Sequence, residues 1–122
     1  MKGTQMDALY GRNGQVVAWL DSDRILDLHG RHMGWIHNEM IVDQGRVRGW
    51  FMSGWIRDTS GGAVAFSGEA NGFGPVKPVR GVRPVRPVRS VRPVKPVWPV
   101  RPTRPTVTSS WSPYSVGQIF VE

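Results

Sequence analysis

Residues 14–20 read GQVVAWL, and three later stretches repeat this pattern: GRHMGWI at 30–36, GRVRGWF at 45–51 and GGAVAFS at 61–67. The leading glycines, Gly14, Gly30, Gly45 and Gly61, stand 16, 15 and 16 residues apart. A short apolar stretch precedes each glycine. A period near 16 residues, with glycine at the turn, is typical of a hairpin of two short strands. The sequence therefore predicts an all-β domain over residues 8–67, built from four short β-hairpin repeats.

A small residue stands four positions after each glycine, and an aromatic residue follows it directly. The small residues are Ala18, Gly34, Gly49 and Ala65, and the aromatic residues are Trp19, Trp35, Trp50 and Phe66. Neighbouring residues of a strand point to opposite faces of the sheet. We expect the small side chains to converge on a central axis, where backbones approach closely, and the aromatic rings to face away from it. A closed, pseudo-fourfold arrangement would also leave no free strand edge.

The turn residues agree with hairpins. Asn13 and Gly14 favour a two-residue type I′ turn, which needs positive φ at both positions. We expect Asp27, Asp43 and Asp58 to accept hydrogen bonds from backbone amides of the neighbouring turns.

Residues 75–104 consist of ten triplets, which read PVK PVR GVR PVR PVR SVR PVK PVW PVR PTR. A period of three matches the three residues per turn of polyproline II, so the sequence predicts an extended arm with three edges. Gly81 and Ser90 replace proline nine residues apart, and Trp98 replaces a cation. We expect the proline and valine edges to pack on aromatic faces and the arginine edge to point outward. A linker and this arm occupy residues 68–108, and an aromatic terminal strand is predicted at 109–122.

The charge of the chain is divided unevenly. Residues 1–73 hold seven Lys or Arg and eight Asp or Glu, whereas residues 74–122 hold nine Lys or Arg and a single carboxylate side chain. Such asymmetry suggests an acidic or nucleic-acid partner for the arm. The candidate cationic binding residues are Lys77, Arg80, Arg83, Arg86, Arg89, Arg92, Lys95, Arg101 and Arg104.

The aromatic residues have two interpretations. Large rings compensate for a small core, so they can simply be the interior of the domain. Alternatively they line a groove, because polyproline II ligands dock between aromatic rings. The candidate aromatic surface residues are Trp19, Trp35, Trp50, Trp55, Phe66, Trp98 and Trp111.

Residues for catalysis or metal binding are sparse. The chain has no cysteine, and its serines lie in no nucleophile-elbow motif. The three histidines, His29, His32 and His37, fall within one repeat and toward opposite ends of one hairpin, which does not favour a metal site. Asp21 and Asp23 are expected near turns, in capping and solubility roles. We expect no catalytic residue, no cofactor and no metal.

The fourfold G-x-x-x-(A/G)-(W/F) pattern, followed by the PVRGVRPVRPVR triplets and a short aromatic end, resembles the bacterial family of four-fold beta flower proteins. The resemblance covers most of the chain. It implies a β-domain of four hairpin-like petals about a pseudo-symmetry axis, and it implies no site residues. The fourth copy departs from the pattern, because Phe66 replaces tryptophan and Ser67 replaces an apolar residue.

These observations together favour a structural or interaction protein that is not an enzyme. Its arm would pack on its own domain, on a neighbouring copy in a homo-oligomer, or on a protein partner. The alternative is non-specific binding of nucleic acid or an anionic surface through the arm. No apolar segment indicates a leader or a membrane span, so we expect a cytoplasmic protein without membrane insertion.

Overall fold

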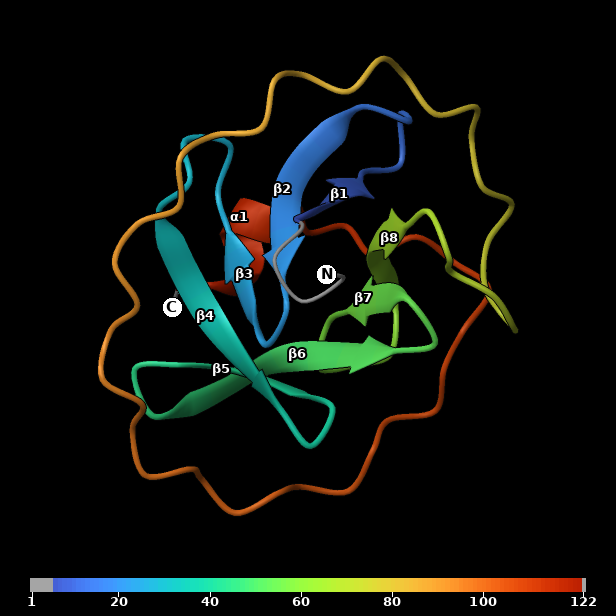
Figure 1. The fold of residues 1–122 in the computed structure, drawn as a ribbon. Coiled ribbons are helices and arrows are strands. Elements are labelled where there is room, and N and C mark those ends of the chain that lie inside the picture. The colour runs from blue at the N-terminus through green and yellow to red at the C-terminus, as the bar shows by residue number, and fades with distance from the viewer. Residues whose placement is uncertain (1–5, 122) are drawn as a thin grey trace.

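The structure is a computed structural model that describes residues 6–121, and its centre is a closed β-barrel. Eight antiparallel strands follow one another in chain order, and β8 closes onto β1 (Figure 1). The strands are β1 (Asp7–Tyr10), β2 (Val16–Asp21), β3 (Arg24–Leu26), β4 (His32–His37), β5 (Met40–Asp43), β6 (Arg46–Met52), β7 (Trp55–Arg57) and β8 (Ala63–Ser67). The predicted all-β class is confirmed, and closure leaves no edge on the barrel.

One pairing register recurs around the barrel. An aliphatic residue stands opposite a small one in four strand pairs: Leu9 and Ala18, Ile25 and Gly34, Ile41 and Gly49, Ile56 and Ala65. The register shifts directly after each of these four pairs, which bends the strands around the barrel axis. All four aliphatic residues are fully buried in one core cluster with Ala18 and Ala65. Of the aromatic residues that follow the small ones, Trp19 and Phe66 belong to a second core cluster and Trp50 belongs to a third, on the outer side of the barrel wall.

Close backbone approach explains the small residues. A Cβ atom on Gly49 would lie 2.4 Å from the backbone oxygen of Arg57. One on Gly34 would lie 2.6 Å from the ring of Phe120 and 3.0 Å from the backbone oxygen of Val42. The interior therefore has no space for larger side chains at these positions, as expected from the sequence.

The hairpin turns are of two kinds, and the prediction for Asn13 is wrong. A five-residue loop joins β1 to β2, and Gly14 but not Asn13 has positive φ there. Loops of equal length join β3 to β4 and β7 to β8, and in these the Oδ1 atoms of Asp27 and Asp58 accept the predicted backbone bonds. Among the four turns that hold the repeat glycines, the two-residue form is the one between β5 and β6, where Gln44 and Gly45 have φ of 53° and 77°. The third hairpin is therefore shorter than the others.

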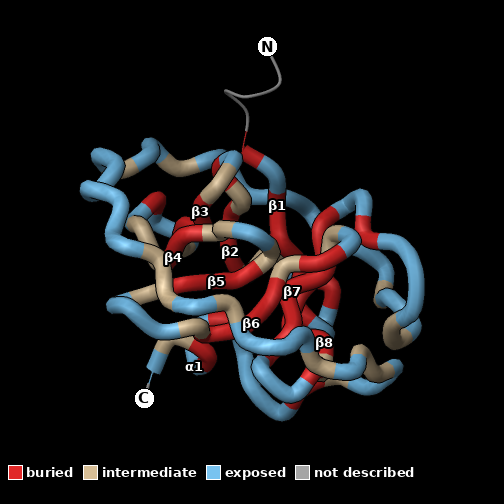
Figure 2. The backbone as a smooth tube through the Cα atoms, turned by 90° about the horizontal axis from the view of Figure 1, so that it is seen from below, coloured by how far each residue is buried: buried red, intermediate tan, exposed pale blue. Residues whose placement is uncertain are grey.

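Residues 75–110, which we call the belt, run once around the outside of the barrel without helix or strand (Figure 1). The belt ends where Trp111 forms one parallel bridge with Ala63 at the start of β8. The chain then passes to one end of the barrel and forms the short helix α1 (Val116–Ile119) (Figure 2). None of the helices within residues 6–121 has the length and apolarity needed to cross a membrane.

The predicted terminal strand at 109–122 is wrong beyond that single bridge. Ser115 and Gln118 form a capping box, in which each side chain bonds the backbone of the other residue. The helical turn places Val116 and Ile119 on one side, and both are buried against the interior cluster of the barrel. A strand has no partner here because the barrel is closed, whereas a helical turn satisfies its own backbone and covers the end of the barrel.

Candidate functional site

The belt is attached to the barrel through backbone amides at regular intervals. Three belt residues donate their N–H to the carbonyl oxygen of a turn glycine. These bonds join Gly81 to Gly14 at 2.7 Å, Ser90 to Gly30 at 2.9 Å, and Thr108 to Gly61 at 3.2 Å. The donors stand at positions 81, 90 and 108, which fit a nine-residue spacing. Position 99 fits the same spacing but donates no such bond. Three triplets of the belt thus correspond to one hairpin of the barrel.

The interruptions of the triplet repeat coincide with these bonds. Proline has no N–H, so Gly81 and Ser90 can donate only because they replace the proline of their triplets. The passed-over position is Pro99, and it corresponds to the shorter turn between β5 and β6. At that turn nothing lies within 4 Å of where a Cβ on Gly45 would stand, whereas at the other three turn glycines a belt carbonyl lies 2.0–2.1 Å from that point. The belt thus has proline at the one repeat glycine whose Cβ position no belt atom approaches within 4 Å.

Two buried arginines of the barrel donate hydrogen bonds to the carbonyl oxygens of Ser90 and Thr108, two of the three amide donors. The Arg24 Nη2 atom donates to the Ser90 carbonyl at 2.9 Å, and the Arg57 Nη1 atom donates to the Thr108 carbonyl at 3.0 Å. The two arginines are only 1% and 2% exposed. A buried guanidinium needs acceptors, and Asp21 supplies a further one to Arg24 at 3.0 Å. Ser90 and Thr108 are therefore each held through both their N–H and their carbonyl oxygen, and we call these two attachments the clamps.

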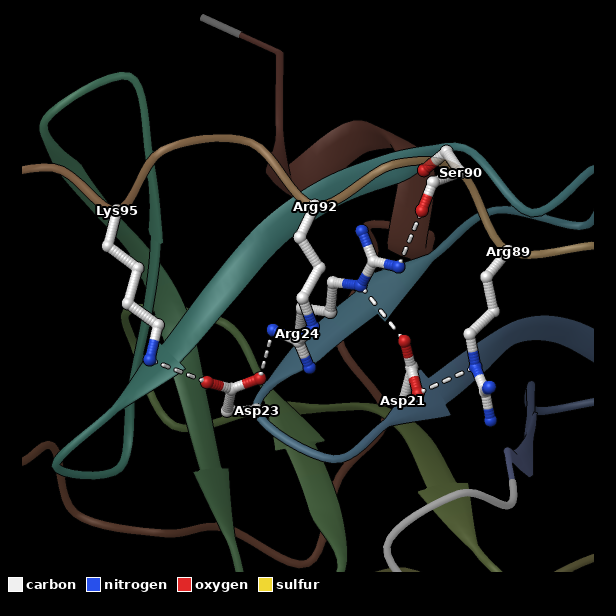
Figure 3. Close-up of polar contacts among 7 residues, drawn as sticks. All are labelled: Asp21, Asp23, Arg24, Arg89, Ser90, Arg92 and Lys95. Atoms are coloured by element: carbon white, nitrogen blue, oxygen red, sulfur yellow. Dashed lines mark hydrogen bonds and ion pairs between the residues drawn. The ribbon is translucent and has the colours of Figure 1, made fainter.

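Several belt cations point inward to carboxylates in or beside the turns between hairpins, and Figure 3 shows Arg89, Arg92 and Lys95. Asp21 pairs with Arg89 at 3.0 Å, while Asp23 pairs with Arg92 at 2.8 Å and Lys95 at 3.1 Å. Burial alone would raise the pKa of Asp23, but its hydrogen bonds and charge interactions with these two cations outweigh burial and lower the pKa. Farther along, Glu39 pairs with Arg101 at 2.8 Å and Arg104 at 3.2 Å.

Aromatic rings of the barrel also receive the cations. Arg92 and Lys95 each lie 5.6 Å from the Trp35 ring centre, and Arg101 lies 5.2 Å from that of Trp50. Where Trp98 takes the place of a cation, its ring stacks on His37, with centroids 4.2 Å apart and an angle of 7° between the planes. Trp98 also packs against the core cluster of Met40, Val42, Trp50 and Met52, so its ring contacts the third hairpin, which lacks the amide bond.

The remaining cations divide into three kinds. Lys77 and Arg86 donate to the backbone oxygens of Ala70 at 2.7 Å and Met6 at 3.1 Å. Arg80 lies over the ring of Tyr10, with its guanidinium carbon 5.6 Å from the ring centre. Arg83 is exposed. Within residues 6–121, eight of the nine candidate cations therefore contact residues outside the belt.

The predicted orientation of the arm is wrong. The nine valines from Val76 to Val100 are 88–96% exposed, and the cations face the barrel instead. Arginine and lysine side chains are long enough to cross the gap between the belt and the barrel wall, and they find both carboxylates and ring faces there. A valine side chain is shorter and has no comparable partners.

The aromatic candidates are mostly interior. Trp19, Trp35, Trp50, Trp55 and Phe66 are buried, which agrees with the interpretation of these rings as core. Trp98 and Trp111 are half-buried and belong to the C-terminal part of the chain. Trp98 packs edge-on against Trp35, with ring centroids 6.4 Å apart. The ring centroid of Trp111 lies 6.0 Å from that of Trp55 and 6.2 Å from that of Phe66. No open aromatic groove remains at these seven positions.

Sequence reasoning missed the acidic acceptors. The sequence pattern predicts only capping and solubility roles for Asp21 and Asp23, and Glu39 is a further acceptor that it does not single out. The available signal was their position on the turns that join successive hairpins, in a domain followed by a run of regularly spaced cations. The histidines do not converge, and no group of three His, Cys, Asp or Glu side chains within residues 6–121 could hold a metal ion.

The fold is that of a small all-β protein: a closed eight-stranded barrel encircled by a basic belt of the same chain. Among known protein families, the one described as 4-fold beta flower protein matches residues 7–120. The chain belongs to this family, as the sequence pattern indicated. No curated protein and no solved structure matches the chain.

Proposed function

We propose that this protein is a non-enzymatic interaction module. Four hairpin petals form the barrel, the belt fastens onto the barrel of the same chain, and the outer edge of the belt is presented to a protein partner. One observation carries the proposal: eight of the nine cations and the bonded amides of the belt contact residues outside the belt, while nine regularly spaced valines are left 88–96% exposed. Exposed apolar side chains that recur in a regular row, at every third residue, support an interaction role for this edge.

The dimensions of the belt support its role as part of the fold. With a polyproline II rise of about 3.1 Å, nine residues span about 28 Å, so four such spans form a circle of about 18 Å radius. An eight-stranded barrel with strands about 4.8 Å apart and tilted by about 40° has a radius of about 8 Å. Adding one packing layer of about 10 Å gives about 18 Å as well. The three-triplet repeat therefore matches the perimeter that a belt needs.

Paired variants test this proposal by separating the two edges of the belt. We expect Arg92→Gln with Lys95→Gln to lower the melting temperature, because Asp23 loses both partners. We expect Val91→Ser with Val94→Ser to leave the melting temperature unchanged, because both side chains are exposed. Equal loss of stability in the two pairs would contradict the assignment of the edges.

Partner capture completes the test. Tagged wild-type chain and the valine pair are used in parallel purifications from the same cells, and we expect a protein that the wild type retains and the valine pair loses. Identical sets of retained proteins would contradict the proposed interaction edge. Self-association is read from the molecular mass of the purified wild type by light scattering.

Binding of nucleic acid or an anionic surface is the alternative, favoured by the net charge of +7 and by the exposed Arg83. It has less support, because eight of the nine cations contact carboxylates, rings or backbone oxygens outside the belt. A titration with duplex DNA at 50 and 200 mM salt distinguishes the two functions. Binding at 50 mM salt that is lost at 200 mM would favour the alternative.

A further inference from the structure

One arc of the belt, residues 91–100, is attached to the barrel differently from the rest. Within the part of the chain that the structure describes, no backbone–backbone hydrogen bond joins residues 91–107 to the barrel, although Ser90 and Thr108 at either end are clamped. Side chains alone hold the arc: Arg92 and Lys95 through Asp23, and Trp98 through His37. The arc is therefore fixed along its inner edge, while its outer edge makes no contribution to these contacts.

The outer edge of this arc has a regular composition. Pro93 and Pro96 are both exposed, three residues apart, and the valine after each of them is also exposed. In a conformation with three residues per turn, equivalent positions of successive triplets line up on one edge, about 9 Å apart. The arc thus presents two successive Pro-Val steps on a preformed, extended backbone.

Charge and hydrogen bonding decide what can dock there. The two cations of this stretch pair with Asp23, and the row of exposed valines and prolines itself is apolar and carries no charge for phosphate or for an acidic groove. Proline in each triplet removes a backbone donor, so the arc cannot add as a regular strand to the sheet of a second copy. Two convex belts would also touch only along a short arc, far from the roughly 800 Å² per partner of a stable interface.

An aromatic-lined groove fits these properties. Such grooves bind extended proline-rich segments by placing an apolar side chain and its neighbouring proline between rings, and the ordered backbone reduces the entropic cost of binding. The barrel already receives the inner edge of the same arc on aromatic rings, at Trp35 and, through Trp98, at His37.

We propose that residues 91–100 form a docking edge for a protein domain with an aromatic-lined groove that recognises proline-rich segments in the polyproline II conformation. This proposal rests on the proposed function, since it names the kind of partner that the outer edge of the belt recognises. Pro93, Val94, Pro96 and Val97 are the recognised residues. The inner-edge cations fix the arc but do not contact the partner.

The test uses the full chain and a panel of purified SH3, WW and EVH1 domains, with binding followed by isothermal titration calorimetry. We expect at least one domain to bind with a micromolar Kd. The double variant Val94→Ser, Val97→Ser should weaken that binding at least tenfold and leave the melting temperature unchanged. The matched control, Val79→Ser with Val82→Ser, removes two equally exposed valines outside the arc and should change Kd by less than twofold.

Three results would overturn this inference: no domain of the panel binds at 1 mM, both valine pairs weaken binding equally, or the chain binds only duplex DNA or anionic lipid vesicles. If the panel fails while partner capture still depends on the belt valines, the inference is wrong and the proposed function stands. If the valine variants lose stability, the proposed function itself fails, because the valines would then be part of the fold.

Discussion

Replacing Ser90 by proline tests the clamps directly, and it does so by restoring the regular triplet. The Ser90 N–H donates to the Gly30 carbonyl at 2.9 Å, and the ring of a proline would occupy the position of that hydrogen. The loss of one such bond costs about 1 kcal/mol. The proline ring would also push residue 90 away from the barrel and so weaken the hydrogen bond from the buried Arg24 to its carbonyl oxygen. A hydrogen bond of this charged kind contributes about 1.5–3 kcal/mol.

An opposing effect reduces the net loss. Proline restricts the unfolded chain and stabilises by about 0.4–1 kcal/mol where its conformation is tolerated. We therefore expect Ser90→Pro to lower the free energy of unfolding by about 2 kcal/mol. For a chain of this size, that corresponds to a fall of about 6–12 °C in the melting temperature, measured by circular dichroism or calorimetry.

Two control variants distinguish the amide bond from other effects at this position. Ser90→Ala keeps the N–H and removes a buried Oγ that has no hydrogen-bond partner within residues 6–121, so it should change the melting temperature little. Pro99→Ser makes the reverse change at the turn where no belt atom approaches the Gly45 Cβ position within 4 Å, and it should lower stability by no more than about 1 kcal/mol. A melting temperature for Ser90→Pro within 2 °C of that for Ser90→Ala would refute the reasoning.

Three further predictions concern the barrel interior, the ion pairs of Asp23 and the stack of Trp98 on His37. Gly49→Ala places a Cβ 2.4 Å from a backbone oxygen and should cost about 1–3 kcal/mol in urea unfolding, whereas Gly117→Ala, with nothing within 4 Å, should be nearly neutral. Because the pKa of Asp23 is lowered in the folded chain, its contribution to stability should be complete above the ordinary carboxyl pKa and lost as pH falls through the lowered value. Thermal melts of wild type and Asp23→Asn should therefore converge in acid, and a constant difference would argue against the ion pairs. Trp98→Arg restores the triplet cation but loses the stack on His37, so its melting temperature should fall below that of Trp98→Phe.

Local sequence patterns predicted much of the barrel. The glycine spacing indicated hairpins, and the small residue before each aromatic indicated a crowded interior, because both depend on short-range geometry. The turn prediction failed at Asn13, since the preference for a two-residue turn was overridden by a longer loop at that hairpin. The prediction of a terminal strand failed because a closed barrel offers no strand edge for it to pair with. A local pattern of apolar residues does not reveal that the barrel is closed.

The belt shows the limit of such reasoning most clearly. The sequence alone shows the belt's period of three, its interruptions nine residues apart and its charge, and it predicts an extended backbone. It does not predict which of the three edges meets the barrel, because that depends on partners distant in the chain, such as Asp23 for Arg92 and Lys95.

By itself, the sequence determined the all-β class, the family, the hairpin spacing and the positions where the belt can donate an amide, since each follows from local geometry or from proline's missing N–H. Only the tertiary structure decided that the cations face inward and the valines outward. The reason is physical: the orientation of an extended segment is set by the partners it meets, and carboxylates and aromatic rings on the barrel favour the long cationic side chains over valine.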